Sequence, residues 1–244
     1  MPRPNDRALS ALRPLTFTRR YTGSAPGSAL VTMGRTTVLC TCCVEPKVPE
    51  FLVGKGKGWL TAEYGMLPGS TNTRKPRDKG GKVDGRSVEI QRLIGRSLRA
   101  VVNLDKLGER TLWIDCDVLE ADGGTRTASI TGAVVAAVDA VNSIKGLLTV
   151  PVSDVLTDSV AAVSVGLLDG EERLDLEYVE DRDADVDLNL VMTGSGKIIE
   201  VQAGGEEATF TRAQLDALVT LGESGIRAIT NAQKAALGAA WPFA

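Results

Sequence analysis

A glycine-rich turn followed by an arginine, DGGTRTASITG at 122–132, has the residue types of an anion-binding site. Gly123 and Gly124 allow backbone conformations closed to other residues, so their N–H groups can point together at one anion. Arg126 adds a planar fork of donors that matches phosphate oxygens. The turn has neither the P-loop nor the dinucleotide-binding glycine pattern. It therefore predicts a phosphate site without a nucleotide-binding fingerprint, and an ordinary loop between a strand and a helix is the alternative.

Carboxylates gather in a second stretch, LDLEYVEDRDADVDLNLVMT at 174–193. Asp185 and Asp187 are two residues apart, hence on one face of an extended segment, and Asp181 lies across a short polar turn. Apolar residues alternate from 188 to 192, which places Asp187 on the polar face of that strand. Asp181 and Asp187 are thus candidate acids or Mg²⁺ ligands, and a solvated acidic turn is the alternative.

Basic residues gather between 47 and 99, although the net charge of the chain is only -3. Helical spacing over 86–102 puts a broad apolar face opposite a stripe of arginines, while Arg86 lies off that stripe, where it can turn toward Arg126. The segment 69–85 is polar apart from Val83, so we expect it to be mobile or ordered by a partner. A solvated surface and a phosphate or subunit interface both explain the stripe. The candidate RNA-binding residues are Arg74, Arg77, Arg92, Arg96 and Arg99.

Strands and helices must position these side chains. A strand is expected at 111–119, directly before the glycine turn, and helical spacing follows the turn. The other expected strands are 15–22, 28–33, 36–44, 59–64, 159–168, 173–179, 186–193 and 198–202. A last helix begins at the capping box TRAQ, 211–214. The sequence has no repeat of fixed period and no linker that would separate domains.

The composition limits the class of protein. The chain has 244 residues of which 43% are hydrophobic, enough for a sizeable core, and we expect one domain over 1–244. It contains no His, which removes the commonest general base and zinc ligand. The four Cys lack C-x-x-C spacing and are expected to be reduced core thiols. No apolar run approaches a membrane span or a signal peptide, so we expect a cytoplasmic protein without a membrane partner.

Five segments, in this order, resemble bacterial ribonuclease PH: GWLTAEYGMLP (58–68), GRSVEIQRLIGRSLRA (85–100), DCDVLEADGGTRTASITGA (115–133), DLEYVEDRDADVDLNLVMT (175–193) and IIEVQ (198–202). The resemblance runs over nearly the whole chain with little insertion. It implies an α+β fold of the ribosomal protein S5 domain 2-like type, with mixed sheets and packed helices. The companion RNA-binding domains of polynucleotide phosphorylase are not in the sequence, so the resemblance is to the single-domain members.

The resemblance also implies an activity and an assembly. The family is a phosphorolytic 3′-to-5′ exoribonuclease, or tRNA nucleotidyltransferase, that trims tRNA precursors and other RNA such as rRNA. Inorganic phosphate is its co-substrate and nucleoside diphosphates are released, whereas the reverse reaction adds nucleotides. The implied partner is the 3′ end of RNA, and the implied assembly is a homohexamer built as a trimer of dimers.

Residue by residue, the positions that match the family's phosphate-binding residues are Arg86, Gly124, Thr125 and Arg126, and those that match its acidic catalytic residues are Asp181 and Asp187. Because the chain has no His, an Asp must protonate the leaving 3′ oxygen or hold a metal-bound water that does so. An isolated Asp, with a pKa of about 4, is ionised at neutral pH, so an acid role for Asp187 needs a pKa raised by burial or by neighbouring carboxylates. A Mg²⁺ ion held by Asp181 and Asp187 would not need that shift, and the sequence does not choose between the two. A non-catalytic RNA-binding ring subunit and a two-metal hydrolytic nuclease remain as alternative functions.

Overall fold

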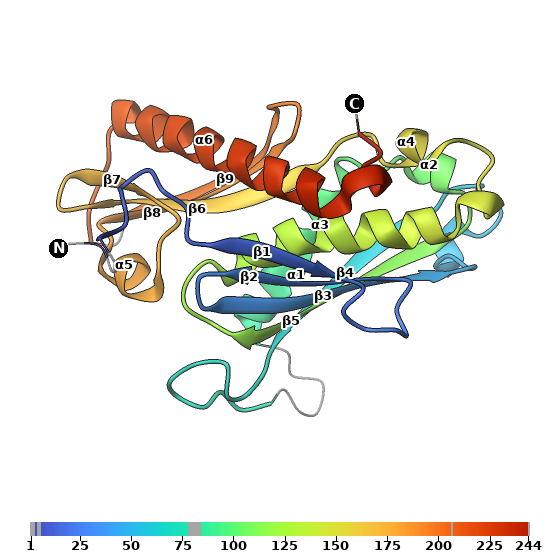
Figure 1. Cartoon of the computed structure of the whole chain (residues 1–244), viewed down its shortest axis with the longest axis horizontal. Coiled ribbons are helices and arrows are strands. Elements are labelled where there is room, and N and C mark those ends of the chain that lie inside the picture. The colour runs from blue at the N-terminus through green and yellow to red at the C-terminus, as the bar shows by residue number, and fades with distance from the viewer. Residues whose placement is uncertain (1–2, 4–5, 78–83, 206, 244) are drawn as a thin grey trace.

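The computed structural model of the chain describes residues 3, 6–77, 84–205 and 207–243. Within these ranges the strands form two sheets, and a long helix, α3, lies between them (Figure 1). The five-stranded sheet has the order β1-β2-β3-β5-β4 and the four-stranded sheet has the order β7-β6-β8-β9. We call them the first and the second sheet. This layered arrangement of sheets and helices agrees with the expected α+β class.

The strands of the first sheet are β1 (Leu15–Arg19), β2 (Gly27–Met33), β3 (Thr36–Glu45), β4 (Trp59–Met66) and β5 (Thr111–Glu120). Neighbouring strands are antiparallel except β4 and β5, which run parallel. The second sheet is antiparallel and consists of β6 (Val160–Leu168), β7 (Glu171–Leu174), β8 (Val186–Thr193) and β9 (Ile198–Gly205). The α-helices are α1 (Gly85–Arg99), α2 (Leu104–Leu107), α3 (Thr125–Ser143), α4 (Val152–Val155), α5 (Tyr178–Asp183) and α6 (Arg212–Leu237).

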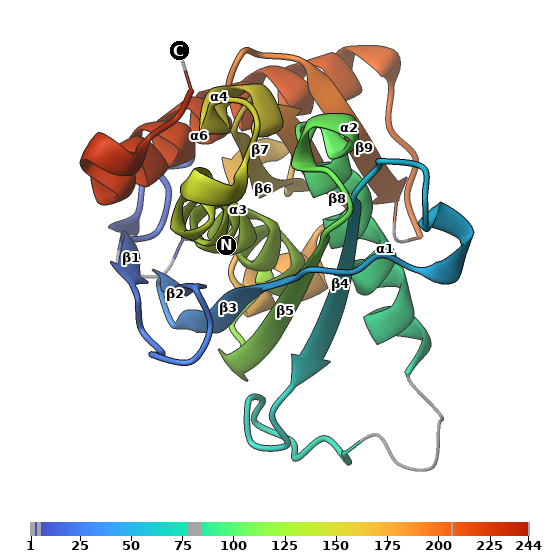
Figure 2. The same cartoon turned by 90° about the vertical axis from the view of Figure 1, so that its right-hand side faces the viewer.

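Helix α3 forms the centre of the core because it is apolar on all sides. Every residue from Thr127 to Val141 is buried. One side of α3 packs on β2 and β3 and the other on β6, while α1 packs beside it (Figure 2). The backbones approach closely, since a Cβ atom on Gly27 of β2 would lie 1.9 Å from the carbonyl oxygen of Ala136. Both sheets are therefore built on the same helix.

Helix α6 covers the opposite face of the second sheet. Strand β6 is buried along its whole length, because α3 lies on one face and α6 on the other. Helix α6 begins with a capping box in which Thr211 and Gln214 exchange hydrogen bonds, as predicted from TRAQ. Its Leu218 is fully buried against the apolar residues of the second sheet. In the part of the chain that the structure describes, no helix is long and apolar enough to cross a bilayer.

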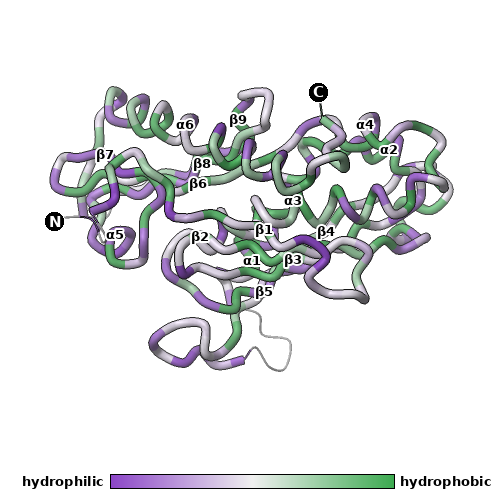
Figure 3. The backbone as a smooth tube through the Cα atoms, viewed as in Figure 1, coloured by the Kyte–Doolittle hydropathy of each residue, from purple (hydrophilic) through white to green (hydrophobic). Residues whose placement is uncertain are grey.

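Residues 67–77, which follow β4, extend away from the body of the molecule (Figure 1). Figure 3 shows hydrophilic residues in this segment. Lys75 pairs with Asp84, 2.7 Å away, and Asp84 is also the N-cap residue of α1. The sequence predicts that residues 69–85 are mobile or ordered by a partner. Residues 78–83 of that segment lie outside the described residues.

The strand predicted at 173–179 is wrong beyond its first two residues. Strand β7 ends at Leu174, and Asp175 then adopts a φ of 57°, a conformation that Asp tolerates better than most residues. Glu177 and Glu180 form a capping box that starts α5 at Tyr178. Asp181 therefore lies in the first turn of a short helix that precedes β8.

Candidate active site

The predicted anion-binding turn joins β5 to α3. Gly123 and Gly124 have φ values of 77° and 67°, which favour glycine, and Gly124 is the N-cap residue of α3. A Cβ atom on Gly123 would lie 2.6 Å from the carbonyl oxygen of Leu176, so the turn packs tightly on the chain before α5. Within the described residues, the N–H groups of Gly123 and Gly124 have no acceptor. The turn therefore offers unpaired donors at a helix N-terminus, as an anion site requires.

Arg126 lies in the first turn of α3 and is held by two other elements. Its Nη1 donates to Glu89 Oε1 of α1 at 3.1 Å and to Gln202 Oε1 of β9 at 2.6 Å. The Gln202 amide also donates to Glu89, at 3.0 Å. The Arg126 side chain is 14% exposed and that of Glu89 is 45% exposed. Because an ion pair with an exposed carboxylate is weak, Arg126 can exchange Glu89 for a phosphate oxygen.

Arg86 lies in the first turn of α1, off the arginine stripe as the helical spacing predicts. Its side chain is exposed. Its charge nevertheless acts on the same two groups as that of Arg126, namely the Asp181 carboxyl and the Tyr64 hydroxyl. Arg86 is therefore close to the site, as expected, although it is not turned into the core.

Two carboxylates approach these arginines from the second sheet and α5. Asp187, on β8, is half-buried and has glycines as its partners on both neighbouring strands, Gly166 on β6 and Gly204 on β9. A Cβ atom on Gly204 would lie 3.5 Å from Asp187 Oδ1. Gly204 therefore leaves room beside the carboxylate for another ligand, whereas the space at Gly166 is filled by Leu176.

Asp181 experiences opposing influences. Partial removal from water raises the pKa of its carboxyl, and the negative charge of Asp187 adds to the rise. Three nearby arginines lower the pKa without cancelling the rise: Arg86, Arg126 and Arg13. The net direction is toward the protonated form, which is the direction that a general acid needs.

The same carboxylates fit a Mg²⁺ ion. Magnesium commonly takes one or two carboxylates and completes its octahedral shell with water and substrate phosphates. Among the residues that the structure describes, no group of three or more His, Cys, Asp or Glu side chains is arranged to hold a metal. Asp181 and Asp187 supply two carboxylates, a number that suits an ion whose other ligands are water and substrate phosphate.

The candidate RNA-binding arginines differ in their surroundings. Arg74, Arg77 and Arg92 are exposed, and within the described ranges they form no ion pair. Arg96 donates to Glu200 of β9 at 2.8 Å. The exposed arginines are available to a polyanion, whereas Arg96 would first have to leave Glu200.

Arg99 is not part of the exposed stripe, contrary to the prediction from helical spacing. Its Nη1 donates to the Leu60 carbonyl at 2.9 Å, and its guanidinium carbon lies 5.4 Å from the ring centroid of Trp59. An aromatic face beside the helix attracts an arginine in this way. Helical spacing predicts the face of α1 from which the Arg99 side chain projects. It does not predict that this side chain contacts Leu60 and Trp59 of β4.

Sequence reasoning missed three residues that support the site. Tyr64 of β4 is buried, and its hydroxyl lies 2.9 Å from Thr125 Oγ1 at the start of α3. Arg13 and Asp175 form a buried ion pair at 2.7 Å behind the glycine turn. Tyr64 lies within the recognised segment GWLTAEYGMLP, which was a usable signal. Arg13 and Asp175 are 162 residues apart, and no local pattern connects them.

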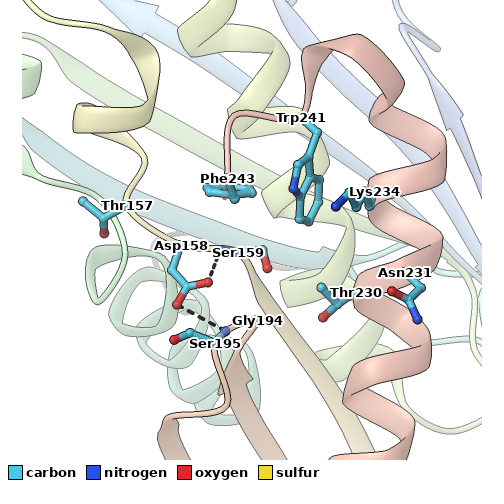
Figure 4. Close-up of a pocket in the computed structure, with 10 residues that line it drawn as sticks. All are labelled: Thr157, Asp158, Ser159, Gly194, Ser195, Thr230, Asn231, Lys234, Trp241 and Phe243. Atoms are coloured by element: carbon cyan, nitrogen blue, oxygen red, sulfur yellow. Dashed lines mark hydrogen bonds between the residues drawn. The ribbon is translucent and has the colours of Figure 1, made fainter.

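The pocket in Figure 4 lies away from these residues. It encloses about 260 Å³ and is lined by the start of β6, the turn between β8 and β9, α6 and the residues after α6. Lys234 and Trp241 are among its lining side chains (Figure 4). None of the candidate phosphate-binding or acidic residues lines it. The candidate site is therefore defined by its convergent charges and unpaired N–H groups and not by this pocket.

Comparisons with protein-family models match most of the chain. Residues 11–141 match domain 1 of the 3′ exoribonuclease family, and residues 158–225 match domain 2 of that family. The first match covers the first sheet with α1 and most of α3, and the second match begins just before β6. The two matches therefore correspond to the two layers that share α3.

Solved structures agree with this match. A crystal structure of rice (Oryza sativa) Rrp46 has a TM-score of 0.77 at 20% identity and covers 96% of this chain and 100% of that chain. A structure of the Archaeoglobus fulgidus exosome with RNA bound to the active site also has a TM-score of 0.77 at 20% identity, covering 94% and 91%. The family match and these structures establish the ribosomal protein S5 domain 2-like α+β fold.

Proposed function

The chain belongs to the 3′ exoribonuclease family, and we propose that it is a phosphate-dependent enzyme that removes nucleotides from the 3′ ends of RNA. One observation carries this proposal: unpaired N–H groups, Arg126 and Arg86 converge with Asp181 and Asp187 at one junction. A non-catalytic RNA-binding subunit needs no such pairing of an anion site with carboxylates. A hydrolytic nuclease needs no pocket for a phosphate nucleophile.

In this mechanism inorganic phosphate is bound by Arg126, Arg86 and the Gly124–Thr125 end of α3. A phosphate oxygen attacks the phosphorus of the last phosphodiester, in line with the leaving 3′ oxygen of the preceding nucleotide. The new P–O–P bond forms as the P–O3′ bond breaks, and the products are a nucleoside diphosphate and an RNA one nucleotide shorter. The arginines and the helix N-terminus stabilise the charge that develops on the phosphoryl oxygens.

The leaving 3′ oxygen needs a proton, and the carboxylates provide two ways to meet that need. The raised pKa of Asp181 favours a carboxylic acid that donates the proton directly. Asp181 and Asp187 would alternatively hold Mg²⁺, which when bound supplies charge neutralisation and an acidic water. In both schemes Asp187 lies beside the open space that Gly204 leaves.

We infer in addition that the substrates are the 3′ ends of tRNA precursors and other structured RNA, and that the chain works as a homohexameric ring of dimers. The exposed Arg74, Arg77 and Arg92 support RNA binding, because backbone phosphates are contacted chiefly by such side chains. The related exosome structure, described as holding RNA at its active site, supports the same substrate class. A ring presents several copies of these arginines to one RNA and raises their effective concentration.

An RNA-degradation assay with and without inorganic phosphate tests the proposal. The expected result is degradation only with phosphate and release of nucleoside diphosphates. Continued degradation without phosphate, with monophosphate products, would indicate the hydrolytic alternative. Binding without degradation under both conditions would indicate a non-catalytic subunit. In the reverse direction, nucleoside diphosphates should extend the RNA and release phosphate.

A further inference from the structure

Arg13 is buried beside the glycine turn and contacts both layers of the molecule. Its Nη1 donates to the Asp122 carbonyl at 2.5 Å, and its Nη2 donates to the Gly123 carbonyl at 3.4 Å. Its Nε and Nη2 also donate to the Asp175 carboxylate, at 3.0 and 2.7 Å. Arg13 is 4% exposed and Asp175 is fully buried. One guanidinium thus connects the turn before α3 with the chain that leads into α5.

The carbonyls that Arg13 holds determine where the N–H groups of the turn point. In a trans peptide the C=O group and the following N–H group point in opposite directions. Fixing the Asp122 carbonyl therefore directs the Gly123 N–H away from Arg13, and fixing the Gly123 carbonyl does the same for Gly124. Thr36 Oγ1 also donates to the Gly123 carbonyl, at 2.6 Å. The N–H groups of Gly123 and Gly124 are the same two that have no acceptor among the described residues.

We propose that Arg13 is a positioning residue for the attacking phosphate, because it holds the glycine turn in the conformation that presents its N–H groups. This inference rests on the proposed function, of which the phosphate site is a part. Two consecutive glycines have many accessible conformations, so an unanchored turn would spend less time in the binding one. The apparent affinity for phosphate falls in proportion to that fraction.

The contacts of Arg13 suit a role in positioning the glycine turn better than a role in stabilising the fold. A buried ion pair adds little net stability, because desolvation of both charges offsets their attraction. A guanidinium, however, has a fixed fork of donors that can bind a carboxylate and backbone carbonyls at once, whereas a lysine ammonium cannot span both. Arg13→Lys therefore keeps the charge beside Asp175 and removes the bridge to the turn.

A matched control exists at the opposite end of α3. Arg19 donates through Nε to Asp139 at 3.0 Å, and through Nη1 to the carbonyls of Ala236 and Leu237, both at 3.0 Å. This arginine also bridges a buried carboxylate and two backbone carbonyls, but it lies at the C-terminal end of α6. Arg19→Lys should therefore have a comparable structural cost without touching the phosphate turn.

The test compares Arg13→Lys, Arg19→Lys and wild type by thermal unfolding and by the kinetics of phosphorolysis. Both variants should unfold at lower temperature. Only Arg13→Lys should raise the KM for phosphate, by about tenfold, because displacement of binding groups by less than an ångström has effects of this size. Its KM for RNA should change less than twofold. An unchanged phosphate KM in folded Arg13→Lys, or an equal rise in Arg19→Lys, would overturn the inference.

Two further measurements keep the inference testable. If Arg13→Lys fails to fold, Thr36→Val removes a hydroxyl that also holds the Gly123 carbonyl while keeping the size of the side chain. It should raise the phosphate KM by a smaller factor, and an unchanged KM would overturn the inference.

If wild type shows no phosphorolysis, the proposed function fails separately. Calorimetric titration of wild type and the folded variant with inorganic phosphate then decides: weaker binding by the variant supports positioning, and equal or no binding refutes it.

Discussion

The layer of the first sheet and the layer of the second sheet contribute groups of opposite charge to the same junction. The first layer provides Arg86 on α1, Arg126 on α3 and the glycine turn, all suited to an anion. The second layer provides Asp181 on α5 and Asp187 on β8. Anion binding and proton supply are thus assigned to different parts of the chain. The reactive geometry depends on how the two layers pack, and α3 determines that packing because it contacts both sheets.

Several polar contacts cross the junction, and two of those beside the glycine turn have the same polarity. Arg126 on the first layer donates to Gln202 on β9, and Arg13, which precedes β1, donates to Asp175 after β7. In both, an arginine of the first layer binds an acceptor of the second. Because the anion-binding groups and the carboxylates lie on different layers, substitutions on the two layers should have separable effects on phosphate binding and on turnover.

The largest expected effect comes from Arg126→Ala. This change removes the cation in the first turn of α3, and turnover by phosphorolysis should fall on the order of 10³-fold. RNA binding should largely survive, because it depends on many backbone contacts. Single-turnover kinetics and a filter-binding assay on the same preparation measure both quantities. Arg212→Ala, which removes an exposed arginine paired with Asp216 on α6, is the control and should match wild type.

Asp187→Asn removes charge and acidity from the second layer at nearly constant size. Turnover should fall on the order of 10²-fold with the oligomer intact, because the change removes the charge that helps to raise the pKa of Asp181 and also one of the two proposed Mg²⁺ ligands. Phosphate affinity should remain near that of wild type, since the anion site is on the first layer. Asp185→Asn, two residues away and exposed, is the matched control and should stay active. Equal loss of phosphate affinity in Asp187→Asn and Arg126→Ala would show that the layers do not act separately.

A smaller effect is expected for Arg92, an exposed arginine of α1 that forms no ion pair among the described residues. Arg92→Ala should weaken binding of folded tRNA several-fold and reduce the slope of log affinity against log salt by about one. Binding of short single strands should change less, because fewer subunits of the ring contact them. Arg227→Ala on α6 serves as the control, as its side chain is 70% exposed. Light scattering should report the same assembly for both variants, and a fully active wild-type monomer would contradict the role of the ring.

The smallest effect concerns thermal stability. The pKa of Asp181 is raised above its ordinary value of 3.8, so the folded state binds the proton more tightly than the unfolded state. The contribution of this group to stability is therefore fully present below pH 3.8 and is lost as the pH rises through the folded pKa. Asp181→Asn should raise Tm at pH 7 by about one to three degrees, a small shift because the carboxyl is only partly removed from water.

The two Tm values should converge below the ordinary carboxyl pKa. Scanning calorimetry in chelator without phosphate measures this pH dependence. A lower Tm for Asp181→Asn at pH 7 would mean that the ionised carboxylate stabilises the fold, contrary to the direction of its pKa shift.

Local sequence patterns predicted the parts of the site that are contiguous in the chain. The alternating strand before the turn, the glycines with positive φ and the capping box of α6 each depend on neighbouring residues, and each was confirmed. The burial of the apolar face of α1 was confirmed for the same reason, with Ile90 and Ile94 fully buried. Where neighbouring residues determine the local conformation, the sequence pattern is sufficient to predict it.

Features decided by distant partners were not predicted. Helix α5 replaces the end of an expected strand because Asp175 turns the chain, and Asp175 is held there by Arg13 from the other end of the sequence. Arg99 leaves the outer face of α1 because Trp59 lies beside it. Neither partner can be inferred from spacing, since each contact exists only after the sheets have packed.

The close packing of α3 has a consequence for motion. The helix cannot shift toward β2 without collision at Gly27, and β6 blocks it on the other side. Its backbone should therefore open only when the whole molecule unfolds, and its amide hydrogens should be among the slowest to exchange with solvent. The anion-binding turn is attached to this immobile element. Any closure around the proposed RNA end would therefore come from outer segments such as α5, moving toward the proposed phosphate site.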